Sequence, residues 1–319
     1  MTRSRRSTCP YALVAAFLAV PLLLALAGCG SKPIVPTAAP VADPVAAAFP
    51  TTISDDASNT ITLGSEPKRI VSLAPANTEI LFALGLGDRV VGVTTYDDYP
   101  PEVKSIAKVG DFTTPNIEAI AAAKPDLILA TTGVQADALK RLKALGATVV
   151  AIDPQNLNGV YTDIERVGKA TGTSAKATEV VSGMRAQVAG VQKAVESTAP
   201  ATTFVEIAQN PLFTAGAGTL IDELIKLAGG INVVTKPGYV AYSSEQLIKA
   251  DPQVYLATKG SMSEPAALAK RAGYAKLQAV VNNRVIILDD NLVSRPGPRI
   301  VDGLKQIAVG LHPDAFPGN

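Results

Sequence analysis

The chain alternates short apolar runs, rich in β-branched residues, with longer segments in which apolar positions recur every three or four residues. In the first half the apolar runs are RIVSLA (69–74), RVVGVTT (89–95), DLILATT (126–132) and TVVAID (148–153). Between them lie two helical patterns, NTEILFALGLG and QADALKRLKALG. In the first pattern Asn77 can cap a helix and Gly85 or Gly87 can end it. Strands and helices in this order predict a parallel sheet with helices on both faces.

The second half repeats this order with TFVEIA (203–208), LIDELIKLAG (220–229), QVYLAT (253–258), ALAKRAGYAKLQ (267–278) and RVIILD (284–289). Between the halves, residues 158–197 show helical periodicity that is interrupted only at Thr171-Gly172-Thr173. Ser174 can cap the second part, a helix of about 24 residues and roughly 36 Å. The pattern therefore predicts an α/β fold of two Rossmann-like lobes with parallel sheets, joined by one long α-helix.

Two segments of the chain repeat each other. EAIAAAKPDLILATTG (118–133) and EQLIKADPQVYLATKG (245–260) align without a gap and share seven of sixteen residues. Each predicts a helix that begins at the Glu, a turn at the Pro and a buried strand, so a duplicated structural unit accounts for the likeness. Glu118 and Glu245 would offset the helix dipole by about 0.3–1 kcal/mol. Alternatively, two carboxylates on one face, one from each lobe, would dock a two-fold symmetric partner through paired arginines.

An aromatic residue stands six positions before each Glu of the repeat, Phe112 in the first copy and Tyr239 in the second. Both lie in loop-like sequence, GDFTTPN and KPGYVAYS, just ahead of the helix starts, where open α/β lobes bind ligands. If Phe112 and Tyr239 were core residues, packing alone would account for them. Their loop setting instead favours two aromatics that face each other across a cleft between the lobes.

The start of the chain has the pattern of an export signal. Arg3, Arg5 and Arg6 precede an apolar run from Tyr11 to Ala27, which ends in LAGC. This motif resembles the lipobox of bacterial lipoproteins, and we prefer that interpretation over a membrane-spanning helix. We therefore expect a signal peptide over 1–28, lipid on Cys29 and a Pro/Ala-rich tether over 29–52. The folded part would divide into an N-terminal lobe (53–156), a linker helix (157–198) and a C-terminal lobe (199–319).

The composition excludes several classes of function. The two cysteines, one inside the segment to be removed, and the single His312 leave no cluster of thiolates or imidazoles for a metal. We interpret His312 as a solvated tail residue. Removal of the three N-terminal arginines changes the formal charge from +1 to −2 (26 basic against 28 acidic residues), which gives no reason to expect a nucleic-acid partner. No P-loop or GxGxxG pattern is present.

The segment from Pro67 to the C-terminus resembles the class III substrate-binding proteins of ABC importers, and among them the cobalamin-binding members. The pieces that carry the resemblance are SLAPANTE (72–79), TTYDDYPP (94–101), GDFTTPNIEAIAAAKPDLI, NPLFTAG (210–216), SSEQLI (243–248) and SRPGPRI (294–300). The resemblance implies a lipid-anchored, extracytoplasmic protein that delivers its ligand to a permease dimer. It implies ligand contacts from Tyr96, Phe112, Phe213, Tyr239 and Arg295. Glu118 and Glu245 match the carboxylates that meet the permease arginines.

The resemblance implies cobalamin as the ligand, with ferric siderophores or haem as alternatives within the same family. The chain has no Trp, whereas the cobalamin-binding members place tryptophans at the positions of Phe112, Thr131 and Tyr239. Phe and Tyr can cover a flat corrin face by offset stacking, but Thr131 cannot. Arg295 would bond amide, phosphate or carboxylate groups of the ligand, or else be a solvated loop charge.

Two rival functions come from other classes. A surface hydrolase would need a nucleophile and a base, and only the adjacent Asp97 and Asp98 suggest one; side chains side by side in a turn usually diverge, and a solvated turn is the simpler interpretation. A surface adhesin would explain the lipid anchor but not the aromatics. We therefore expect a monomeric transport protein with no catalytic residues, no cofactor and no resident metal.

Overall fold

The computed structural model describes residues 49–262 and 264–318. The predicted signal peptide, the lipidation site Cys29 and most of the predicted tether lie outside the described residues. Within the described ranges, no helix combines the length and the apolar character that crossing a bilayer requires.

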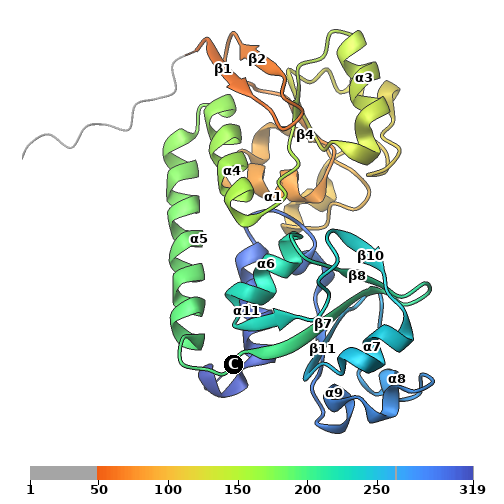
Figure 1. Cartoon of the computed structure of the whole chain (residues 1–319). Coiled ribbons are helices and arrows are strands. Elements are labelled where there is room, and N and C mark those ends of the chain that lie inside the picture. The colour runs from red at the N-terminus through yellow and green to blue at the C-terminus, as the bar shows by residue number, and fades with distance from the viewer. Residues whose placement is uncertain (1–48, 263, 319) are drawn as a thin grey trace, which may run out of the picture. The chain divides into compact units, whose positions relative to one another are not determined.

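The N-terminal lobe is built on a four-stranded sheet in the order β4-β3-β5-β6, and all its neighbouring strands are parallel (Figure 1). The strands are β3 (Ile70–Ser72), β4 (Val90–Gly92), β5 (Leu127–Ala130) and β6 (Val149–Ala151). The helices are α1 (Pro75–Ala83), α2 (Ile117–Ala122) and α3 (Ala136–Ala144). An antiparallel pair precedes the sheet, β1 (Thr51–Ser54) with β2 (Thr60–Leu63), which the sequence pattern did not predict.

The C-terminal lobe is built on a six-stranded mixed sheet. Its strands are β7 (Ala201–Ala208), β8 (Phe213–Ala215), β9 (Gly230–Asn232), β10 (Tyr239–Ala241), β11 (Val254–Thr258) and β12 (Val285–Leu288). The order is β10-β8-β7-β11-β12, with β9 also paired to β7; β8 and β10 run antiparallel to their neighbours and the other pairs are parallel. The helices are α6 (Leu220–Leu227), α7 (Ser244–Ala250), α8 (Ala266–Ala269), α9 (Gln278–Val281), α10 (Asp290–Val293) and α11 (Ile300–Leu311). The two α/β lobes confirm the predicted fold class, with β8 and β10 as an antiparallel addition to the second sheet.

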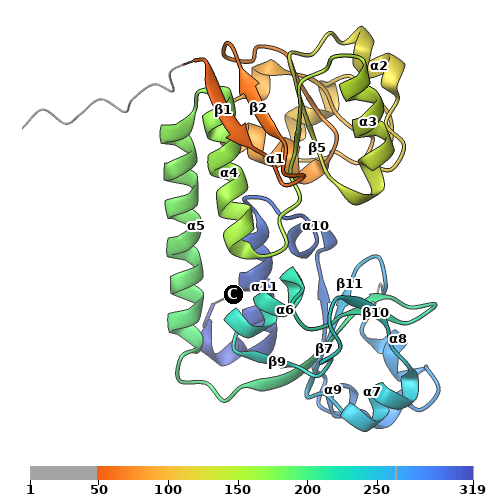
Figure 2. The same ribbon diagram turned by 45° about the horizontal axis from the view of Figure 1, so that its top comes forward.

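Two consecutive helices connect the lobes, α4 (Leu157–Thr171) and α5 (Ser174–Val195). Gly172 between them has φ +78°, and its lack of a side chain permits this left-handed turn. The long helix α5 packs against α4 of the first lobe and against α6 and α11 of the second (Figures 1 and 2). Its buried stripe of Ala177, Val181, Met184, Val188, Val191 and Val195 belongs to one apolar cluster that includes core residues of both lobes. The helix is therefore packed along its length by both lobes.

Several local predictions were wrong. Asn77 lies inside α1, which begins at Pro75, so it is not the cap. Thr173, whose side chain makes no capping hydrogen bond, occupies the cap position predicted for Ser174. His312 is buried, and its Nε2 lies 3.1 Å from the carbonyl oxygen of Gly229. The single helix predicted over 267–278 is broken into short pieces, because Gly273 adopts φ +81° in its middle.

The repeated segment forms the predicted helix, turn and buried strand in both lobes. Asn116 caps α2 and Ser243 caps α7, so each Glu of the repeat is the second residue of its helix. The turns also match, because Lys124 (φ 47°) and Asp251 (φ 41°) occupy equivalent positions before the Pro and both adopt the left-handed conformation. This conformation is uncommon for residues other than glycine, so the two copies share a backbone path and not only a composition.

The turn that contains Asp97 and Asp98 is anchored from inside the N-terminal lobe. Asp97 is 4% exposed and accepts hydrogen bonds from the backbone N–H and the hydroxyl of Thr94. Its other oxygen meets the hydroxyl of Thr78, which lies 2.8 Å from that of Ser72, and the Ser72 hydroxyl donates to the carbonyl of Ala74. The Thr78 hydroxyl has one hydrogen and can donate to Asp97 or to Ser72 but not to both, so a proton on Asp97 would complete this chain of contacts. The prediction of a solvated turn was therefore wrong for Asp97.

Stability should depend on pH through Asp97. Burial raises the pKa of Asp97 above its ordinary value of 3.8. The folded protein then binds this proton at higher pH than the unfolded chain does, so the contribution of Asp97 to the unfolding free energy is largest at low pH and decreases as pH rises through the raised pKa. Asp97→Asn cannot ionise, and its amide can donate to Thr78 where the proton did. We expect the variant to gain stability relative to wild type between about pH 4 and about pH 7, measured by urea unfolding.

Asp97→Leu is the control for this prediction. It cannot accept from the Thr94 N–H, so it should destabilise the protein by about 1–3 kcal/mol at every pH. A difference between Asp97→Asn and wild type that is constant over this pH range would show that Asp97 is equally protonated in the folded and unfolded states.

Candidate ligand-binding site

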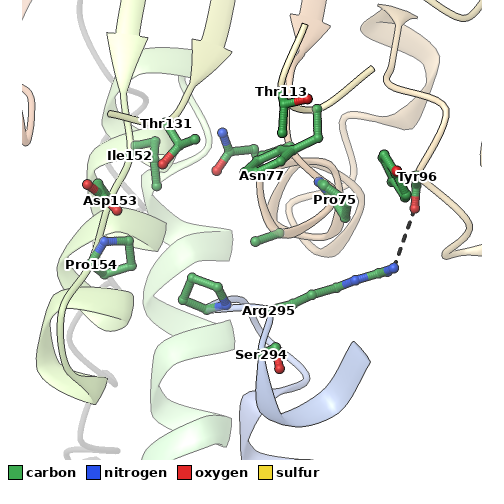
Figure 3. Close-up of a pocket in the computed structure, with 14 residues that line it drawn as sticks. Pro75, Asn77, Tyr96, Thr113, Thr131, Ile152, Asp153, Pro154, Ser294 and Arg295 are labelled. Carbon is green, nitrogen blue, oxygen red and sulfur yellow. Dashed lines mark hydrogen bonds between the residues drawn. The ribbon is translucent and has the colours of Figure 1, made fainter. Parts of the chain in front are cut away.

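A cavity of about 380 Å³ opens where the carboxyl ends of β3, β5 and β6 meet the first turn of α1 (Figure 3). The N-terminal lobe supplies most of the wall, including Pro75, Asn77, Phe112, Thr131 and Asp153. The C-terminal lobe supplies the segment 294–296, between α10 and α11. Parallel sheets bind ligands beyond the carboxyl ends of their strands, so this cavity has the expected position for a binding site.

The structure brings three of the predicted ligand residues together at this cavity, Tyr96, Phe112 and Arg295. Tyr96 is 58% exposed. Figure 3 shows the aliphatic stem of Arg295 crossing the cavity below Pro75, with its guanidinium directed to the backbone of Tyr96. The alternative interpretation of Arg295 as a solvated loop charge is wrong, because its side chain is only 14% exposed.

The other two predicted ligand residues are not among the residues that line this cavity. Phe213 is half-buried on β8, and Tyr239 is exposed on β10. The sequence suggested a loop for Tyr239, but Phe213 and Tyr239 each belong to a three-residue strand, and the two strands pair with each other. Strands of this length are too short to give an alternating pattern. That Tyr239 faces Phe112 across a cleft stays a prediction.

Sequence reasoning missed two buried amides that shape the cavity. Gln135 is fully buried; its amide nitrogen donates to the carbonyls of Leu73 (2.6 Å) and Phe112 (2.7 Å), and its oxygen accepts from the N–H of Thr131. It therefore ties the loop of Phe112 to the ends of β3 and β5. Asn77 lines the cavity and donates to the carbonyl of Ala130. The sequence holds no signal for Gln135, because the carbonyls to which it donates, those of Leu73 and Phe112, are distant along the chain.

Four charged side chains meet beside the cavity. Glu79 of α1, only 2% exposed, binds the fork of Arg299 through both carboxylate oxygens (2.6 and 2.9 Å) and also binds Arg295 (3.2 Å). Arg295 additionally binds Asp98 at 2.6 Å. Burial raises the pKa of Asp98, but the hydrogen bond and charge of Arg295 outweigh it and hold that pKa below its ordinary value. The hydrogen bonds to Glu79 raise the pKa of Arg299. These contacts therefore favour the charged forms of Asp98 and Arg299.

The described lining of the cavity is mainly apolar and neutral. It contains no Cys, His or Lys, and its one carboxylate, Asp153, accepts from the hydroxyl of Thr132. Within the described ranges, no group of three or more His, Cys, Asp or Glu side chains is placed to hold a metal ion. The wall of prolines, alanines and aromatics offers apolar contact to a ligand.

The two carboxylates of the repeat lie away from the cavity lining. Glu118 and Glu245 are both exposed, in the first turns of α2 and α7. The N-cap residues Asn116 and Ser243 hold the backbone of each first turn, because their side-chain oxygens accept hydrogen bonds from backbone N–H groups. Both carboxylates are thus free for contact with another molecule.

Known proteins similar to this chain are solute-binding proteins. It is 39% identical over 277 residues to an uncharacterized ABC transporter substrate-binding lipoprotein of Bacillus subtilis, covering 84% of this chain and 87% of that one. It is 31% identical over 247 residues to the vitamin B12-binding protein of Vibrio cholerae, covering 76% and 89%.

Two similar solved structures are also periplasmic binding proteins. A possible iron-binding, periplasmic solute-binding protein of Staphylococcus epidermidis matches with a TM-score of 0.71 and 34% identity, covering 78% of this chain and 100% of that one. The periplasmic haem-binding protein of Roseiflexus sp. matches with a TM-score of 0.71 and 29% identity, covering 79% and 100%.

The periplasmic binding protein family matches residues 70–292, which include both sheets and the helices that join them. Together with the two-lobed fold and the identity to its relatives, this match shows that the chain belongs to the periplasmic binding protein family and is a solute-binding protein, not an enzyme.

Proposed function

We propose that this protein is the lipid-anchored, extracytoplasmic substrate-binding component of an ABC importer and that it captures cobalamin or a related corrinoid for a permease dimer. The observation that carries the choice of ligand is the charge of the cavity. Arg295 is the only basic residue in its described lining, and two carboxylates already bind its guanidinium. Apart from the carboxylate of Asp153, the cavity therefore presents apolar and neutral polar groups to its ligand, and it offers no unpaired cation to an anionic one.

This charge balance favours a neutral ligand surface over an anionic one. Haem carries propionates and many ferric siderophores carry negative charge, so each needs a cation to replace the water it loses on binding. A corrinoid presents an apolar face and a rim of neutral amides. The amide of Asn77 and the hydroxyls of Thr113 and Thr131, which line the cavity, are suitable partners for such amides.

The size of the cavity indicates how a large ligand would be held. At about 380 Å³ it is near the lower end of the usual 300–1,000 Å³ for ligand pockets. A corrinoid is larger than such a cavity can enclose, so only part of its face would rest on Phe112 and the prolines. Phe213 and Tyr239 remain our candidates for contacts outside the cavity.

A ferric siderophore or haem is the second candidate. It is favoured by the iron-binding and haem-binding names of two similar solved proteins and by the absence of Trp from this chain. It would require Arg295 to share its charge between the ligand and the two carboxylates that already bind it.

Titration with a panel of ligands tests this proposal. We expect cyanocobalamin to bind at least about tenfold more tightly than haem or a ferric hydroxamate, a difference of about 1.4 kcal/mol, in calorimetric titration of the purified protein. Tighter binding of haem or of the iron chelate would show that the second candidate is correct.

Truncation of the aromatics tests the contacts. Phe112→Ala and Tyr239→Ala should each weaken cyanocobalamin binding by about 1–3 kcal/mol, because each removes a flat apolar contact. Phe204→Ala is the control, since Phe204 is fully buried in the C-terminal core and its loss should instead lower the melting temperature. Unchanged affinity in both ligand variants would place the ligand elsewhere.

Reversal of charge tests the docking role of Glu118 and Glu245. Changing either to Lys should leave cyanocobalamin affinity nearly unchanged and lower cobalamin uptake by whole cells, because like charges would oppose the permease arginines. The double variant should be the most impaired. Glu165→Lys, an exposed carboxylate on α4, is the control and should leave uptake normal. A tenfold loss of affinity that the loss of uptake simply follows would contradict a docking role.

A further inference from the structure

The loop Arg-Pro-Gly-Pro-Arg (295–299) of the C-terminal lobe packs closely against helix α1 of the N-terminal lobe. Arg295 and Arg299 stand on either side of Gly297, and both bind the buried carboxylate of Glu79. A side chain at Gly297 would lie 3.3 Å from the carbonyl oxygen of Ala76, so glycine permits this close approach to the first turn of α1. Ala76 and Arg295 both line the cavity. This contact therefore joins the part of the cavity wall from the N-terminal lobe to the part from the C-terminal lobe.

The neighbouring turn of the N-terminal lobe completes this contact. Asp98 binds Arg295 and also accepts from the side-chain amide of Asn291 at 3.3 Å. The ring of Tyr99 lies under the guanidinium of Arg299, 3.8 Å from its carbon to the ring centroid. Asp97 anchors the same turn inside its own lobe through Thr94 and Thr78. The segment 96–99 thus connects the cavity, which Tyr96 lines, to the C-terminal lobe.

The charges of this cluster are balanced among themselves. Two arginines face two carboxylates, and Arg295 donates to both carboxylates and to the carbonyl of Tyr96 at 3.4 Å. These bonds occupy both Nη1 donors and one Nη2 donor of the guanidinium, and the two carboxylates offset its charge, so a ligand carboxylate or phosphate would compete with Glu79 and Asp98 for the attraction of this cation. Its stem, by contrast, already lies in the cavity wall (Figure 3).

We propose that Arg295 is a positioning residue: its guanidinium holds the two lobes together through Glu79 and Asp98 and thereby sets the width of the cavity, and only its aliphatic stem contacts the ligand. The statement about the ligand rests on the proposed function, and the statement about the lobes does not. The cluster of Glu79, Asp98, Arg295 and Arg299 is an inter-lobe clasp, and it determines which ligand widths the site accepts.

A double-mutant cycle separates the clasp from direct ligand contact. The full-length protein, Asp98→Asn, Arg295→Met and the double variant are titrated with cyanocobalamin. Methionine keeps an unbranched apolar stem and leaves Arg299 bound to Glu79, so the variant should fold. If the clasp exists, each single change should weaken cyanocobalamin binding by roughly three- to tenfold. The double variant should bind no more weakly than Arg295→Met, because both changes act on one ion pair. If Arg295 instead binds the ligand, Asp98→Asn frees it and affinity stays equal or increases, which would overturn the proposal.

Hydrogen exchange without ligand provides the second measurement. Asp98→Asn and Arg295→Met should speed amide exchange in the segments 96–99 and 294–299. Lys226→Met is the matched control, since it removes an exposed lysine paired with Asp222 inside α6, and it should change neither exchange in these segments nor affinity. Unchanged exchange in both test variants would overturn the clasp. If the wild-type protein fails to bind cyanocobalamin, the proposed function fails, and the exchange rates still decide whether the clasp exists.

Discussion

The geometry of the site depends on one buried carboxylate. Glu79 is almost completely removed from water, and a buried charge is tolerated only when opposite charges and hydrogen bonds compensate it. Its partners Arg295 and Arg299 come from the other lobe, and removing one partner of a buried pair typically costs about 3–5 kcal/mol. The fold can satisfy Glu79 only by holding the segment 295–299 against α1. The position of one cavity wall relative to the other follows from this requirement.

The same requirement gives the cavity its chemical character. Because the guanidinium of Arg295 is bound by Glu79 and Asp98, the residue adds apolar stem and no free charge to the lining. The opposite wall is held by neutral groups, since Gln135 bonds the loop of Phe112 to the strand ends. Charge is thus used mainly for structure at the margin of the cavity, and the groups left for the ligand are neutral except for Asp153. This division is the physical reason for preferring a neutral, largely apolar ligand face.

Much of the fold could be predicted from the sequence, because its signals are local. The apolar runs at Ile70, Leu127 and Val254 are long enough to show buried strands, and the repeat correctly places Glu118 and Glu245 in the first turns of their helices. The strands β8 and β10 were missed because three residues carry no periodicity.

The contacts of the site could not be predicted, because they join residues far apart in the chain. Glu79 and Arg295 are separated by 216 positions, and nothing local distinguishes their pairing from a solvated charge. Both lie in motifs that the resemblance to binding proteins singled out, SLAPANTE and SRPGPRI, but the resemblance suggested a ligand contact for Arg295 and gave no role to Glu79. The repeated unit explains why the sequence revealed the positions of Glu118 and Glu245 but not the pairing of Glu79 with Arg295. It supplies equivalent helices with exposed carboxylates, which suit a two-fold partner, whereas the cavity is lined mainly by one lobe. Under the proposed function, the residues for a symmetric partner form a repeat that the sequence reveals, whereas the residues for an asymmetric ligand occur once and are brought together only when the lobes pack.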